Sequence, residues 1–197
     1  MNQGLIVLAS ASPRRRELLD QIGLCYLVRP VKIDESRMTG ESPAELAVRL
    51  SVDKARAAAL DGAAVVLAAD TVVALDDDVL GKPRNRADGM AMLRRLSGRM
   101  HRVYTGVACL ASHQVQTALS VSRVSFRTLS ERECSAYWDT GEPQGKAGAY
   151  AIQGRAAAFV SRLEGSYSGV VGLPLFETAE LLRDRGIDVA GQLGSDR

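Results

Sequence analysis

Three arginines stand at the start of a predicted helix. Ser12 and Pro13 are typical of the residue that caps a helix and the first residue inside it. The first helical turn then contains Arg14, Arg15 and Arg16. This end of a helix carries about half a positive charge, so each cation there is unfavourable by about 0.3–1 kcal/mol. A bound anion would justify the arrangement, because free backbone N–H groups and guanidinium groups both bind oxyanions. The alternative is that the arginines extend into water.

Two expected strands end in polar residues. The apolar runs 4–10 (GLIVLAS) and 64–70 (AVVLAAD) are typical of buried strands, and we expect them to end at Ser10 and Asp70. Open α/β sheets place ligand-binding groups at the carboxyl ends of their strands, so these two side chains should lie close together. The Asp70 carboxylate should then lie at the rim of the core. The alternative is an aspartate that starts a turn or caps Thr71.

Two lysines stand where a cation could face a pocket. On the predicted helix 42–60, Lys54 lies about 20° from Ala47 around the helix axis, on the stripe that should face the core. It either points into a pocket or extends along the apolar surface toward water. Lys82 lies in GKPR, a Gly/Pro loop after a predicted hairpin, and the alternative for it is an ordinary surface turn.

Glu35 lies beside Asp34 in a polar loop, where a carboxylate could bind a divalent cation or simply be solvated. Together the candidate residues suit a metal-bound polyphosphate, because phosphoryl chemistry needs cations at the phosphate oxygens, carboxylates for a metal ion and a base for water. The candidate anion-binding residues are Ser10, Arg14, Arg15, Lys54 and Lys82, and the candidate carboxylates are Glu35 and Asp70.

An α/β framework must position these residues. Helices are predicted from Pro13 to Gly23 and over 42–60, 87–98, 130–141 and 172–186; the second opens with a capping box of Ser42 and Glu45. Residues 25–33 should be extended, 72–83 should form a short hairpin, and 101–111 and 114–129 should form an antiparallel pair. Residues 145–167 read as strand and loop punctuated by glycine. This mixture of parallel crossovers and an antiparallel ribbon predicts a mixed, twisted sheet.

The composition predicts one globular domain over residues 1–197. The chain is 46% hydrophobic and 24% charged, with a formal net charge of only +2, which gives weak support to nucleic-acid binding. No apolar run is long enough to span a membrane, and no leader pattern is present, so we expect a cytoplasmic protein.

Other catalytic and metal-binding classes fit poorly. The sequence has neither GxxxxGK[ST] nor GxGxxG, which disfavours a P-loop or a dinucleotide fold. We expect both histidines, His101 and His113, to be structural. The three cysteines, Cys25, Cys109 and Cys134, are expected to be buried free thiols.

Several segments, in this order, carry a family resemblance: LASASPRRRELL, IDES, ESPAELAVRLSVDKA, AADTVV, LGKPR, LSGRMHRVYTGV, KAGAYAIQG and VVGLPLFE. They resemble the Maf (septum-formation-inhibitor-like) nucleoside triphosphate pyrophosphatases. The resemblance implies an ITPase-like α/β fold with a central twisted mixed sheet flanked by helices, and two lobes around a cleft. It also implies hydrolysis of a nucleoside triphosphate between the α and β phosphates with Mg²⁺ or Mn²⁺, and a homodimer.

The same resemblance implies a role for each site residue. Asp70 resembles the family's catalytic proton acceptor, and Glu35 and Asp70 resemble its metal-binding carboxylates. The residues implied to contact substrate are Ser10, Arg14, Arg15, Lys54, Thr71, Lys82 and Gln153.

Arg14, Thr71 and Gln153 are similar to the residues of the dTTP/UTP-directed subgroup. The amide of Gln153 offers a donor and an acceptor, which suits the O2, N3–H and O4 groups of a pyrimidine. Two alternatives stay open here. One is the 7-methyl-GTP-directed subgroup, which typically has Trp after the Ser-Pro pair and Gln after the catalytic Asp. The other is a nucleic-acid-binding or division-regulating protein. If the chain is instead a pyrophosphatase, we expect it to need neither nucleic acid nor a membrane as a partner.

Overall fold

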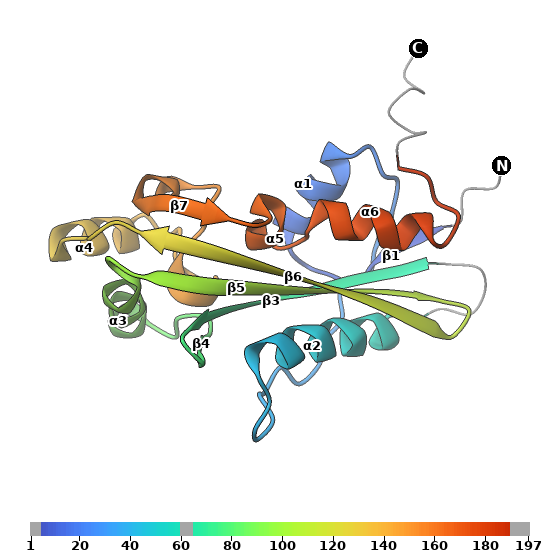
Figure 1. Ribbon diagram of the computed structural model, residues 1–197, viewed down its shortest axis with the longest axis horizontal. Helices are drawn as coiled ribbons and strands as arrows, with labels where there is room; N and C mark the ends of the chain where they lie inside the picture. The colour runs from blue at the N-terminus through green and yellow to red at the C-terminus, as the bar shows by residue number, and fades with distance from the viewer. Residues whose placement is uncertain (1–4, 60–64, 190–197) are drawn as a thin grey trace, which may run out of the picture.

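The computed structural model describes residues 5–59 and 65–189. Its seven-stranded sheet has the order β2-β1-β3-β5-β6-β7, and β4 also pairs with β3 (Figure 1). β1 is parallel to β2 and β3, whereas the other pairings are antiparallel. The predicted mixed sheet is therefore confirmed. The strands are β1 (Ile6–Leu8), β2 (Leu27–Val28), β3 (Val65–Leu75), β4 (Asp78–Leu80), β5 (Met100–Ala111), β6 (Gln114–Phe126) and β7 (Val160–Glu164).

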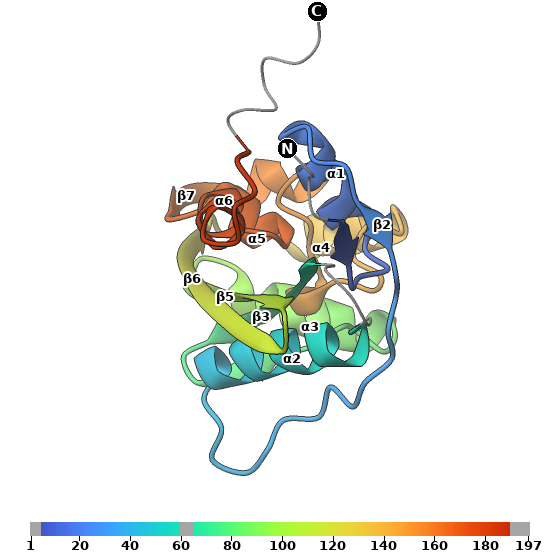
Figure 2. The same ribbon diagram turned by 90° about the vertical axis from the view of Figure 1, so that its right-hand side faces the viewer.

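Helices flank the sheet on both faces (Figures 1 and 2). The α-helices are α1 (Pro13–Gln21), α2 (Pro43–Ala57), α3 (Arg86–Leu96), α4 (Glu131–Asp139), α5 (Tyr167–Val171) and α6 (Leu175–Arg183), and the 3-10 helices are η1 (Ala147–Ala149) and η2 (Arg155–Phe159). No α-helix within the described residues is long and apolar enough to cross a lipid bilayer.

The two faces of the sheet have separate apolar cores, because successive side chains of a strand point to opposite faces. On β3, Val66 and Ala68 face the cluster beneath α2, whereas Leu67 and Ala69 belong to the larger cluster on the other face. That larger cluster includes side chains from α1, α3, α4, α5 and α6. The core thus fixes α1 on one side of β3 and α2 on the other.

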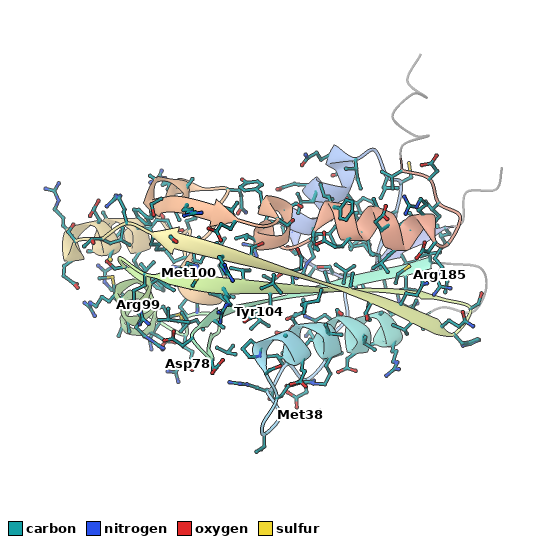
Figure 3. The ribbon with its side chains drawn as sticks, viewed as in Figure 1. Met38, Asp78, Arg99, Met100, Tyr104 and Arg185 are labelled. Carbon is teal, nitrogen blue, oxygen red and sulfur yellow. The ribbon has the colours of Figure 1, made fainter. Side chains whose placement is uncertain are left out.

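Both predicted hairpins are present. In the β3–β4 turn Asp76 has φ of 56°, and in the β5–β6 turn Ser112 and His113 have φ of 48° and 65°, as expected of tight turns between twisted strands. At the first turn Arg99 forms an ion pair with Asp76 at 2.9 Å. Figure 3 labels Arg99 and also Asp78, the first residue of β4, which marks the position of this turn. The structural interpretation of His113 agrees with this turn position.

Several local predictions need correction. Cys25 is exposed, because it precedes the short edge strand β2, whereas Cys109 and Cys134 are buried as expected. α5 was not predicted; its N-terminus is capped by Ser166, which accepts a hydrogen bond from Gly169 N–H. The predicted helix 42–60 ends at residue 57, and residues 4, 60 and 64 of the predicted segments lie outside the described residues.

Candidate active site

The candidate site lies beside an uncovered stretch of β3. One edge of β3 pairs with β5 along 66–74, whereas the other edge pairs with β1 over 65–67 and with β4 over 73–75. Within the described residues, no strand pairs with 68–72 on this second edge, and Asp70 is at the centre of that gap. A cavity of about 600 Å³ opens there.

The prediction that a strand ends at Asp70 is wrong, because β3 continues to Leu75. The apolar residues that follow Thr71 keep the strand going into the hairpin with β4. The strand that ends at the site is β1, whose last residue is Leu8. Ser10 and Asp70 still lie close to one cavity, so the predicted proximity holds although the predicted strand end does not.

The structure brings every predicted site residue to this one cavity. The cavity is lined by Ser10, Arg14, Arg15, Glu35, Lys54, Asp70, Thr71, Lys82 and Gln153, and also by Lys146 and Tyr150. The cleft implied by the resemblance is thus present. Lys146 had not been singled out from the sequence, although it lies in the KAGAYAIQG segment as that segment's only charged residue.

Lys54 joins the two candidate carboxylates. Its ammonium Nζ lies 2.5 Å from Asp70 Oδ1 and 2.6 Å from Glu35 Oε1. Lys54 and Asp70 are both buried. Of the two alternatives for Lys54, the structure supports the pocket. Asp70 does not start a turn or cap a helix, because it lies within the continuous strand β3. Its side chain lines the cavity instead.

A glycine brings Lys54 to Asp70. Gly106 is the β5 partner of Asp70, and a Cβ on it would lie 2.4 Å from the backbone oxygen of Ala47 in α2. The helix can therefore lie directly on the sheet at this point. Lys54 is seven residues after Ala47, which is two helical turns along the same face. Its side chain consequently reaches the neighbour of Gly106 in the sheet.

Arg15 is held by residues from three separate segments of the chain. Its Nε donates to Gly172 O at 2.8 Å, and its Nη1 donates to Ser10 Oγ at 3.2 Å. Nη2 reaches Thr71 Oγ1 at 3.5 Å. Burial lowers the pKa of Arg15, whereas the Asp70 charge works in the opposite direction. Of the alternatives for the arginine run, Arg15 therefore points inward.

The side chain of Ser12 does not cap α1, although Ser12 is the N-cap residue. Its backbone N–H instead donates to Ser10 Oγ at 3.1 Å. The first N–H groups of this helix thus have no side-chain cap, and Ser12, Arg14 and Arg15 line the cavity, an arrangement that suits an anion. Arg14 and Lys146 approach the same region: burial lowers the pKa of each, and the charge of Arg14 lowers that of Lys146 further.

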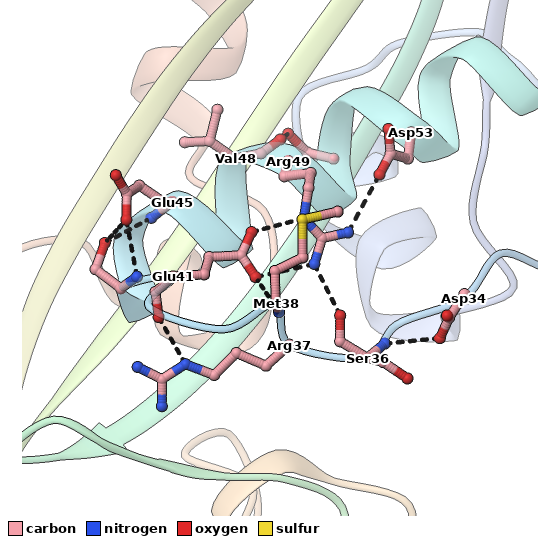
Figure 4. Close-up of polar contacts among 11 residues, drawn as sticks. Asp34, Ser36, Arg37, Met38, Glu41, Glu45, Val48, Arg49 and Asp53 are labelled. Carbon is pink, nitrogen blue, oxygen red and sulfur yellow. Dashed lines mark hydrogen bonds and ion pairs between the residues drawn. The ribbon is translucent and has the colours of Figure 1, made fainter.

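The loop that carries Glu35 is tied to α2 by Arg49 (Figure 4). The guanidinium binds both carboxylate oxygens of Glu41, at 2.6 and 3.0 Å, and donates to Ser36 O at 2.9 Å. Glu41 in turn accepts the Met38 N–H at 3.0 Å. The Arg49 guanidinium holds the pKa of Glu41 below its ordinary value. These contacts fix the loop one residue beyond Glu35.

Glu35 is also contacted by Lys82, whose Nζ lies 3.3 Å from Oε2. Burial works to raise the pKa of Glu35, but Lys54 and Lys82 outweigh it and the pKa is lowered. Lys82 is exposed, and its loop is joined to the opposite wall because Gly148 N–H donates to Gly81 O at 3.0 Å. Lys82 and Glu35 are thus loop residues that face the cavity rather than free surface groups.

The carboxylates of Glu35 and Asp70 are positioned so that both could contact one divalent cation. One oxygen each of Glu35 and Asp70 converges on the same point, now occupied by the Lys54 ammonium. Two carboxylate oxygens are typical ligands of Mg²⁺ that keeps water and phosphate oxygens as its other ligands. Within residues 5–59 and 65–189, no group of three or more His, Cys, Asp or Glu side chains could hold a metal ion. Two carboxylate oxygens leave most ligand positions of a divalent cation unfilled, so other oxygens, such as those of a phosphate, would have to complete its shell.

Comparisons with known proteins show which family the chain resembles along most of its length. The family described as Maf-like protein matches residues 5–185. A dTTP/UTP pyrophosphatase of Alkalilimnicola ehrlichii is 54% identical over 190 residues, which cover 93% of this chain and 94% of that protein. A dTTP/UTP pyrophosphatase of Vibrio cholerae is 52% identical over 179 residues, 90% of this chain and 96% of that protein. A solved Ham1 protein of Coxiella burnetii aligns at 19% identity and a TM-score of 0.44, over 62% of this chain and 73% of that chain.

Proposed function

The chain belongs to the Maf family, and on this premise we propose that it hydrolyses dTTP and UTP to the monophosphate and pyrophosphate. The observation that carries the proposal is the cavity in which the Lys54 ammonium joins Glu35 and Asp70, with Arg15 nearby. This combination of cations and carboxylates suits a polyphosphate and a divalent cation. The relatives' substrate names supply the identity of the nucleotide.

In the proposed reaction, Arg15, Lys54 and Lys82 neutralise the triphosphate oxygens, and Ser10 with the start of α1 donates hydrogen bonds to them. Water attacks the α-phosphorus while Asp70 accepts one of its protons. The bond from the α-phosphorus to the bridging oxygen breaks, and its electron pair leaves with pyrophosphate. Arg15 is already fixed by Gly172 and Ser10, so little reorganisation is needed when charge develops.

We propose Mg²⁺ or Mn²⁺ as the cofactor, held by Glu35 and Asp70. When bound, such an ion neutralises phosphate charge and lowers the pKa of water. Lys54 must give up its position between the two carboxylates for this to happen. A bound triphosphate would allow Lys54 to leave the two carboxylates, because the phosphate oxygens are new partners for its ammonium group. The cation should therefore bind weakly to the protein alone and more tightly with nucleotide, which calorimetric titration with and without a non-hydrolysable UTP analogue can measure.

We further propose that Arg14, Thr71 and Gln153 contact the nucleotide and that Gln153 selects the base. Its exposed side chain lines the cavity, and its amide can donate to and accept from a pyrimidine edge. A single domain over residues 1–197 is supported by one sheet that joins elements from β1 to β7. The homodimer and the cytoplasmic location stay predictions.

A panel of purified nucleotides tests the function. Wild-type protein is incubated with dTTP, UTP, CTP, dITP and 7-methyl-GTP, each with Mg²⁺, with Mn²⁺ and with chelator, and pyrophosphate release is measured. We expect release from dTTP and UTP that chelator abolishes. Asp70→Asn protein, purified in the same way, controls for contaminating enzymes. Preferred release from 7-methyl-GTP, or release of orthophosphate in place of pyrophosphate, would contradict the proposal.

A further inference from the structure

The pocket wall that carries Gln153 is tied to α4 just before this residue. Ala151 N–H donates to the Tyr137 hydroxyl at 3.1 Å. Tyr137 is itself buried and packs edge-to-face against Phe159, with ring centroids 5.1 Å apart. The backbone on this side of Gln153 is thereby attached to the apolar core.

Just after Gln153 the backbone is tied to Glu142. The N–H groups of Arg155 and Ala156 donate to its carboxylate oxygens at 3.0 and 3.4 Å. These two residues begin η2, whose first N–H groups have no partner within the helix, and Gly154 offers no capping side chain. Glu142 thus caps a helix from thirteen residues away along the chain. A carboxylate is favourable at this end of a helix.

The two ties form one network. The Tyr137 hydroxyl donates to Glu142 Oε1 at 2.7 Å, so the same carboxylate joins α4 to the start of η2. Burial works to raise the pKa of Glu142, but the Arg155 N–H and the Tyr137 hydroxyl outweigh it, and the pKa is lowered. Glu142 is therefore held as an ionised acceptor of hydrogen bonds from both sides of the Gln153 turn.

Gly154 has a role in admitting this carboxylate. A Cβ on Gly154 would lie 2.4 Å from the carboxyl carbon and oxygens of Glu142. Its φ of −107° is outside the left-handed region, so backbone conformation alone does not require glycine here. The missing side chain instead provides the space in which Glu142 reaches the backbone beyond Gln153.

We propose that Glu142 is a positioning residue for base selection, which fixes the turn that presents the Gln153 amide to the nucleotide base. This inference rests on the proposed function, because it takes Gln153 as the residue that reads the base. It adds that selection depends on a carboxylate that lines no part of the described cavity and acts through the backbone.

The test compares UTP with CTP, because CTP presents an N4 amino group and an N3 acceptor where UTP presents O4 and N3–H. In Glu142→Gln we expect the ratio of kcat/KM for UTP to that for CTP to fall about tenfold, the effect of about one hydrogen bond. The kcat for UTP should change by less than about threefold on the same scale. In a Gln153→Ala background, Glu142→Gln should cause no further loss of selection, because both substitutions act on one interaction.

Glu133→Gln is the matched control. Glu133 also lies near the start of a helix as an ionised carboxylate, in the capping box of α4 with Ser130, and it contacts Arg127 rather than the Gln153 turn. It should leave selection intact. Gly154→Ala is a second test of the same contact, since its methyl group displaces the Glu142 carboxylate, and it should reproduce the loss of selection.

Selection that is unchanged in Glu142→Gln, an equal loss for every nucleotide, or a loss that multiplies with that of Gln153→Ala would overturn the inference. The nucleotide panel on the wild type decides the proposed function separately, before any Glu142 variant is made. Hydrogen exchange needs no substrate: amides of residues 151–156 should exchange faster in Glu142→Gln, while those of α2 stay unchanged. Unaltered exchange over 151–156 would also overturn the positioning role.

Discussion

Two halves of the pocket are held in different ways. In one half, Ser10, Arg15 and Asp70 are attached to β1, α1 and β3, and their surroundings are the buried core. In the other half, Glu35, Lys82 and Gln153 lie on loops, with side chains partly or largely exposed. Lys54 of α2 connects the halves through its contacts with Asp70 and Glu35.

The comparison shows two ways to fix a polar group. In the first half the backbone is fixed by packing, and hydrogen bonds to Gly172 and Ser10 hold Arg15 on it, so its charges need little reorganisation. The second half has little apolar surface to bury, and polar clamps replace packing: Arg49 with Glu41 holds the Glu35 loop, and Glu142 holds the Gln153 turn. Substitutions in the first half should therefore reduce turnover, and those in the second should change nucleotide binding and selection.

Asp70→Asn should give the largest effect, because it removes the proposed proton acceptor from the packed half. We expect kcat for pyrophosphate release to fall about 10²- to 10⁴-fold, the usual contribution of general base catalysis. Asparagine keeps the shape of the side chain and can still accept from Lys54, so the thermal unfolding midpoint should change little. Near-normal kcat in this variant would remove Asp70 from the proposed role.

His101 should make the stability of the protein depend on pH. This residue joins the packed sheet to the cavity wall that contains Tyr150. It is buried in β5, and its Nε2 lies 2.8 Å from the hydroxyl of Tyr150, which lines the cavity. Burial lowers the pKa of His101 from 6.5 to about 4. The unfolded chain therefore takes up this proton first. The stability contributed by the neutral ring is present above pH 6.5 and is lost as the pH falls toward about 4.

The full loss amounts to roughly 3 kcal/mol of unfolding free energy. Urea unfolding of the wild type and of His101→Gln, measured from pH 7.5 down to pH 4, can isolate it. The variant keeps a hydrogen-bonding group for Tyr150 but cannot titrate, so its free energy of unfolding should fall less steeply with decreasing pH. Parallel curves for the two proteins would show that His101 makes no such contribution.

The residues of the packed half were the easier ones to predict from the sequence. Helical periodicity places Lys54 on the inward face of α2, and the Ser42 and Glu45 capping box forms as predicted. The polar residue after an apolar run identifies Asp70, although the local pattern gave the wrong strand end. β3 is continuous to Leu75 because it pairs with β5, which is distant in sequence, along residues 66–74, and it then turns directly into the hairpin with β4.

Contacts made by the fold as a whole had no local signal. Thr71 lies beside Thr105 only because β3 and β5 pair in this register, and Arg15 is held by a carbonyl group 157 residues away. Glu142 was not identified either, because its partners are the Tyr137 hydroxyl and two backbone N–H groups that no local residue pattern connects to it. The clamps of the loop half are tertiary contacts, so side-chain type alone could not reveal them.

Arg49→Met should give the smallest of these effects. It tests whether the hydrogen bonds of Arg49 hold the Glu35 loop in place. Methionine keeps much of the side-chain length but loses the bonds to Glu41 and Ser36. Glu35 would then spend less time beside Lys54, so KM for the metal–nucleotide complex should rise about tenfold, with a smaller change in kcat. Steady-state kinetics with UTP at several Mg²⁺ concentrations would measure both.

Arg94→Met is the control, because Arg94 makes a similar two-bond pair with Glu131, on α3 and away from the cavity. It should leave both kinetic constants near the wild-type values. If Arg49→Met lowers kcat while leaving KM unchanged, then the Glu35 loop contributes to turnover as much as the packed half does. The division between a packed half for turnover and a clamped half for binding would then be wrong.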